Sequence, residues 1–141
     1  MNTLLIILTA VAAGVTTYFI ANKLNKGAVL ASASVTLASG IAFPHFFPTM
    51  GSTLMVVAAC ASYGGMVSRK NAPTLGDMVM ISVIIGMLFT ITASSYAGIG
   101  GRLGTIAAIS CFVWLGVKNS AKAASRARKS DFLSKSVGIW Q

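Results

Sequence analysis

The chain has 141 residues, of which 55% are hydrophobic and only 9% are charged, and its formal net charge is +9 at pH 7. Soluble domains carry about 25% charged residues. The composition therefore excludes an ordinary soluble domain and predicts an all-α integral membrane protein. At about 20 residues for each membrane-spanning helix, this length allows one compact bundle of a few spans.

The first apolar segment covers residues 3–21 and contains no charge, and Lys23 and Lys26 follow it. A secretory signal peptide has a basic region before an apolar stretch of about 7–15 residues. Here only Met1 and Asn2 precede the apolar run, and the run is longer than such a stretch. We therefore expect residues 3–21 to form a first transmembrane helix.

The next segment, residues 27–67, contains no formal charge. As a single helix it would be about 60 Å long, twice the hydrocarbon thickness of about 30 Å. Pro44 and Pro48, with Gly51 just beyond, disfavour a continuous helix and place a turn at residues 44–51. The sequence thus predicts two helices, at residues 27–47 and 50–67.

A polar stretch then leads into two more predicted helices. Residues 68–77 have the composition of a loop, and we expect the Asp77 carboxylate to cap a helix over residues 78–97. Glycines at residues 98–104 mark the next turn, and the apolar run that follows, residues 103–117, is short for a span. It is long enough if the fifth helix covers residues 99–117 with Arg102 reaching toward the lipid headgroups, or if the helix continues past Lys118. The predicted fold is a bundle of five transmembrane helices, residues 1–117, followed by a basic tail, residues 118–141.

The basic residues predict the orientation, because cytoplasmic loops of membrane proteins are enriched in Lys and Arg. With five spans, ten of the 11 basic residues lie on the side of the tail, and Arg102 alone lies on the other side. Four or six spans would move the basic tail to the opposite side. We expect the N-terminus outside and the tail in the cytoplasm of an energy-transducing or bacterial inner membrane.

The tail is predicted to form a basic helix, because its positive charges recur every three or four residues among alanines. One interpretation is that it lies on anionic lipid, and the other is that it docks onto an acidic partner subunit. Nucleic acid is not expected, since no aromatic stacking surface accompanies the charge. The candidate docking residues are Lys118, Lys122, Arg126, Arg128, Lys129 and Lys135.

Small residues spaced four apart predict close helix packing, because they let two backbones approach in a membrane. The hydroxyl residues within the spans suit hydrogen bonds across the same contacts, or the lining of a polar path. Packing against neighbouring subunits or against copies of the same chain would use the same faces. The candidate packing residues are Ala10, Gly14, Ala61, Gly65, Gly100 and Gly104.

Chemistry that needs ionisable groups inside the membrane is not expected. Both acids, Asp77 and Asp131, fall on the tail side of the predicted spans, so a self-contained ion pump is disfavoured. No nucleophile motif, phosphate loop or metal-ligand spacing occurs, and we predict no enzyme activity, cofactor or metal. Cys60 and Cys111 lie in apolar runs and are expected to be inert thiols. His45 is assigned with Arg102 to the outer interface, where an aromatic patch would anchor the turn.

These features predict a small non-catalytic subunit of a larger membrane complex, of the energy-coupling or transport kind, with the tail as a cytoplasmic clamp. The alternative is a self-associating pore or small transporter, including a holin-like permeabilising protein. A third interpretation, a subunit that handles quinone or lipid, requires polar groups to converge on His45 or Arg102.

Overall fold

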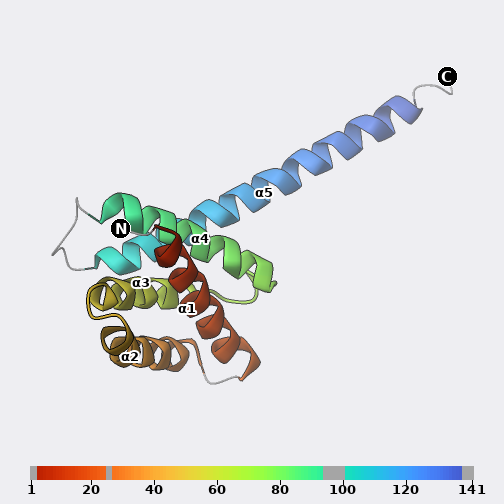
Figure 1. Cartoon of the computed structure of the whole chain (residues 1–141). Coiled ribbons are helices and arrows are strands. Elements are labelled where there is room, and N and C mark those ends of the chain that lie inside the picture. The colour runs from red at the N-terminus through yellow and green to blue at the C-terminus, as the bar shows by residue number, and fades with distance from the viewer. Residues whose placement is uncertain (1–2, 25–26, 94–100, 138–141) are drawn as a thin grey trace.

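The computed structural model describes residues 3–24, 27–93 and 101–137, and the side chains as far as residue 128. This part of the chain is all-helical, as predicted, with five helices and no strand (Figure 1). The helices are α1 (Thr3–Lys23), α2 (Ala28–Phe46), α3 (Gly51–Gly64), α4 (Leu75–Thr92) and α5 (Arg102–Val137). Of these, α1, α2, α4 and α5 are long and apolar enough to cross a membrane.

The turn between α2 and α3 is shorter than the predicted stretch of residues 44–51. Pro44 lies inside α2, and the amides of Phe47 and Gly51 close the turn by donating to the carbonyls of Phe43 and Phe47. Pro44 cannot donate to the carbonyl of Gly40, so it weakens the last turn of α2, and the helix ends two residues later. Gly51 is needed here, since an added Cβ would lie 2.5 Å from the Phe43 carbonyl oxygen.

Helix α3 is also shorter than predicted, because it ends at Gly64 rather than near residue 67. Its 14 residues span about 21 Å, which is less than the hydrocarbon thickness of a bilayer. The chain continues through turns from Gly65 to Thr74 and is held against α1, where the Tyr18 hydroxyl donates to the carbonyl of Ala72 at 2.6 Å. Ala72 is fully buried at this contact.

The fifth helix does not stop at residue 117. Helix α5 is continuous for 36 residues, about 54 Å, and its second half projects away from the other helices (Figure 1). The helical tail expected from the charge spacing is therefore present as far as Val137, but it extends the last helix of the bundle without a break.

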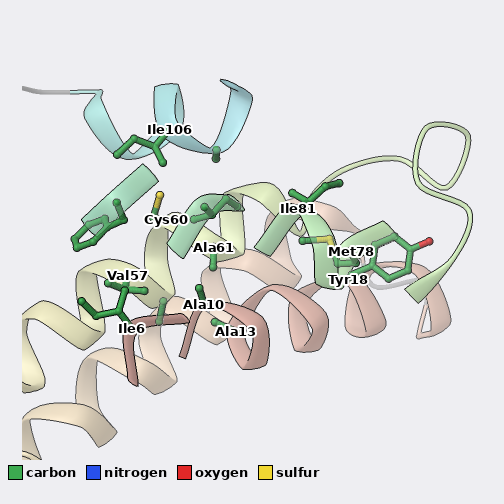
Figure 2. Packing of buried hydrophobic residues seen from close by; sticks show 14 of the residues in the cluster. Ile6, Ala10, Ala13, Tyr18, Val57, Cys60, Ala61, Met78, Ile81 and Ile106 are labelled. Carbon is green, nitrogen blue, oxygen red and sulfur yellow. The ribbon is translucent and has the colours of Figure 1, made fainter. Parts of the chain in front are cut away.

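The core lies where α1 packs against α3 and α4, while α2 covers α1 and α3, and α5 covers α3 and α4. Figure 2 shows its buried side chains, which combine small residues of α1 and α3 with large aliphatic residues of α4. Small side chains on two helices bring their backbones close, and the larger side chains of the third helix fill the space that remains. The buried core includes Ile6, Ala10, Ala13, Val57, Ala61, Met78, Ile81 and Ile85.

Two ends of this bundle can be distinguished by their contacts. One end, which we call the Asp77 end, contains the start of α4. A surface pocket of about 160 Å³ there is lined in part by Lys23, Arg69 and Pro73. At the opposite end, which we call the Arg102 end, α4 finishes and α5 begins, and the guanidinium of Arg102 lies 5.1 Å from the ring centre of Phe89. The described basic residues thus concentrate at the Asp77 end and beyond it on α5.

Candidate functional site

The start of α4 is fixed by a capping box. Thr74 is the N-cap, and its hydroxyl oxygen accepts from the amide of Asp77 at 3.2 Å. The Asp77 carboxylate accepts in return from the Thr74 amide at 3.2 Å and from the Thr74 hydroxyl at 2.8 Å. The predicted helix over residues 78–97 therefore begins three residues earlier, at Leu75, and its N-cap is Thr74 rather than Asp77. Asp77 still takes part in capping, as the third residue of the helix in a capping box.

Two side chains of α5 complete the surroundings of Asp77. The indole of Trp114 donates to Oδ1 at 3.0 Å, and the ammonium of Lys118 donates to both carboxylate oxygens at 2.8 and 2.7 Å. Trp114 and Lys118 are four residues apart and so lie on the same face of their helix. The Asp77 side chain is 6% exposed and that of Lys118 is 23% exposed.

This cluster is a buried ion pair whose hydrogen bonds are well satisfied, and it joins the start of α4 to the middle of α5. Removing either partner would leave a charge without compensation, which is the costly way to disturb such a pair. The carboxylate accepts from four groups of the chain: the Thr74 amide and hydroxyl, the Trp114 indole and the Lys118 ammonium. Lys118, which the sequence grouped with the docking residues, is thereby neutralised within the chain.

The remaining docking candidates lie on the part of α5 that extends beyond the ion pair. Lys122, Arg126 and Arg128 are exposed, as is every residue from 119 to 128. Lys129 and Lys135 belong to the same helix, but their side chains lie outside the described part. The structure therefore presents a continuous basic helix starting one turn after Lys118.

Most of the packing candidates lie at the contacts of α1 with its neighbours. Gly14 faces Ser82 of α4, and a Cβ at Gly65 would lie 2.7 Å from Thr17 and 2.8 Å from the Gly14 carbonyl oxygen. Ala10 and Ala61 are fully buried. Gly104 instead faces open space, and Gly100 lies outside the described residues.

Hydroxyl groups join α2 to α3. The Ser62 hydroxyl lies 3.0 Å from that of Ser32 and 3.1 Å from that of Thr36. Other hydroxyls of the helices, such as that of Thr17, donate to the carbonyl four residues earlier. These interactions satisfy the hydroxyl groups within and between helices, which is the packing role that the sequence suggested for them.

The outer-interface candidates both lie at the Arg102 end, but they do not meet. His45, in the last turn of α2, is exposed and packs edge-on against Phe46 at 5.6 Å between ring centres. Arg102 lines a separate pocket between α3, α4 and α5. Cys60 is buried with its thiol donating to the Leu103 carbonyl at 3.3 Å, and among the described residues no three His, Cys or acidic side chains form a metal-binding group.

Comparison of the chain with models of protein families, with curated proteins and with solved structures found no match.

Proposed function

We propose that this protein is a small, non-catalytic, membrane-spanning subunit of a larger membrane complex, and that the basic extension of α5 docks onto an acidic surface of a partner subunit. The observation that carries this proposal is the unbroken helix from residue 119 to residue 137, which is exposed as far as its side chains are described, at residue 128. We define the α5 extension as residues 119–137. The kind of complex, energy-coupling or transport, remains the prediction made from the sequence.

The surface of the bundle supports a position in a lipid bilayer. Large apolar side chains point outward on several helices, and a bilayer would solvate them where water would not. The contacts that join neighbouring helices are small residues and hydroxyls, as membrane bundles use. The exposed apolar residues include Leu4, Leu8, Val29, Leu37, Ile41, Ile91, Phe112 and Val117.

The distribution of charge supports an orientation with the Asp77 end in the cytoplasm. Lys23 and Arg69 share one pocket there, and the α5 extension leaves the bundle beyond the same end. Arg102 is the only basic residue of the described part at the other end. Under the positive-inside tendency, this arrangement favours an N-terminus outside and an α5 extension in the cytoplasm.

The α5 extension favours a protein partner because it lacks the usual sources of helix stability. Its described residues are exposed, whereas most helical stability in proteins comes from packing. Lys122 and Arg126 are spaced four apart, and like charges at this spacing are unfavourable by about 0.2–0.5 kcal/mol. Acidic groups of a partner would relieve this repulsion.

The direction of α5 favours a partner protein over the lipid surface as the docking site. A helix that lies on lipid headgroups runs in the plane of the membrane, whereas α5 continues beyond the bundle in the direction of its packed part (Figure 1). A helix that crosses the membrane and then projects straight onward reaches into the cytoplasm. A protein surface in the cytoplasm, rather than the membrane itself, would contact Lys122, Arg126 and Arg128.

The test is purification of the full chain from its native host through an N-terminal tag, in mild detergent, with mass spectrometry of the proteins that remain bound in near-equal amounts. We expect such partners with the native chain and with a variant that exchanges Lys and Arg (K122R, R126K and R128K). The variant K122Q, R126Q and R128Q should lose them, and higher salt should weaken the association.

Two outcomes would overturn the proposal. If the Gln variant retains the same partners in the same amounts, the basic side chains are not the contact. If the native chain elutes only with copies of itself, and its expression collapses the membrane potential, the pore interpretation replaces the subunit interpretation.

A further inference from the structure

We infer that the pocket around Arg102 binds the phosphate group of a phospholipid. The pocket has a volume of about 360 Å³, within the range of small-molecule sites. It lies at the end of the bundle opposite the proposed partner contact and does not depend on that contact. Its lining residues are Ser52, Thr53, Val56, Phe89, Ala93 and Arg102.

In the part of the chain that the structure describes, Arg102 forms no ion pair with an acidic side chain. The sequence contains two acidic residues. Asp77 is paired with Lys118 at the other end of the bundle, and Asp131 is about 43 Å further along α5. Solvent or a bound anion therefore balances the charge of Arg102, which is partly exposed.

The guanidinium is also partly withdrawn from solvent without compensation. Its Nε atom is buried and has no hydrogen-bond partner in the described part of the chain, and one face of the group lies over the Phe89 ring. A buried donor without an acceptor is unfavourable by about 1–3 kcal/mol, more when it is charged. A bound anion would supply the missing acceptor and the missing charge together.

The neighbouring residues add further donors suited to an anion. Ser52 and Thr53 bring two hydroxyls to the pocket and belong to the first turn of α3. The N-cap residue of that helix, Met50, has no side-chain capping bond. The Gly51 amide donates to the Phe47 carbonyl, which leaves the first-turn amides of Ser52 and Thr53 for an anion. Arg102 itself opens α5, and helix N-termini favour anions.

Phosphate fits this arrangement better than a carboxylate, because its several oxygens can accept from a guanidinium fork and from hydroxyls at the same time. The apolar part of the lining, Val56, Phe89 and Ala93, suits the beginning of an acyl chain below the phosphate. A phospholipid supplies both parts, and free phosphate supplies only the first.

The experiment is native mass spectrometry of the full chain purified in mild detergent, with phosphatidylglycerol added in increasing amounts. We expect one molecule to be retained and the R102Q variant to raise its Kd at least tenfold. R102K, which keeps the charge but not the fork, should give a smaller increase. K70Q, which removes an exposed charge from the loop before α4, is the matched control and should bind as the native chain does.

A second variant keeps the test valid if the R102Q variant does not fold. T53V keeps the shape of the side chain but removes its hydroxyl, and it should raise the Kd about threefold while circular dichroism stays unchanged. Equal binding by the native chain, R102Q and T53V would overturn the site. If inorganic phosphate stabilises the native chain but not R102Q, and no phospholipid is retained, the lipid assignment is wrong and the site takes soluble phosphate.

Discussion

Replacing Asp77 by Asn tests the buried ion pair between α4 and α5. The change removes one charge and leaves Lys118, whose side chain is 23% exposed, without its partner. Breaking a buried pair from one side destabilises by about 3–5 kcal/mol. Because the Lys118 ammonium retains some contact with solvent, we expect D77N to lower the free energy of unfolding by about 3 kcal/mol.

The assay is reversible unfolding in mixed micelles, followed by circular dichroism and, in a W140F background that leaves one tryptophan, by the fluorescence of Trp114, which contacts the carboxylate directly. K118M should also destabilise, and the double variant D77N and K118M should be less destabilised than the sum of the two, with a coupling of about 1–3 kcal/mol. K122M, one turn further along α5 and exposed, should change stability by less than about 0.5 kcal/mol.

The reasoning fails if D77N and K118M each change the free energy of unfolding by no more than the K122M control. Additive effects of the two substitutions would also contradict it, since they would mean that the two charges do not interact in the folded chain.

Three further substitutions test the packing by the same unfolding assay. G65A should destabilise by about 1–3 kcal/mol, because the new Cβ would lie 2.8 Å from the Gly14 carbonyl oxygen; native-like stability would mean that α1 and α3 can separate freely. G116A should instead stabilise by up to about 1 kcal/mol, since it raises helix propensity where nothing lies within 4 Å; a loss of stability would show an unseen contact. Y18F should cost about 1–2 kcal/mol by removing the 2.6 Å bond to the Ala72 carbonyl, and no change would place that loop away from α1.

Several features of the fold were accessible from the sequence because they depend on local composition. Runs without charge of nearly 20 residues mark α1 and α4, and the prolines with Gly51 mark the turn before α3. The spacing of Ala10 with Gly14 and of Ala61 with Gly65 indicates helix faces without large side chains. Those faces lie at the contacts of α1 with α3 and α4.

Other features depend on contacts between distant residues and were missed. Lys118 looked like the first residue of a separate tail, because a charge usually ends an apolar span. Its pairing with Asp77, 41 positions away, lets the charge remain on the bundle and lets α5 continue. The one local signal was the spacing of Trp114 and Lys118 on the same helix face.

The end of α3 and the pocket at Arg102 also depend on contacts between distant residues, so the sequence does not predict them. Gly64 ends α3 where its backbone approaches Ile85 of α4, and no local pattern indicates that approach. Arg102 was expected to reach the headgroups, but its grouping with Ser52 and Thr53 depends on how α5 packs against α3.

The central claim is that the α5 extension contacts a partner protein, and site-specific photocrosslinking in the native membrane tests it most directly. A photoreactive amino acid at Ala124, which is exposed on the α5 extension, should crosslink to one protein in high yield. The same group at Ile41, exposed on α2, should crosslink mainly to lipid unless α2 faces another subunit. Crosslinks from Ala124 to lipid alone, or to no other molecule, would contradict the proposed docking.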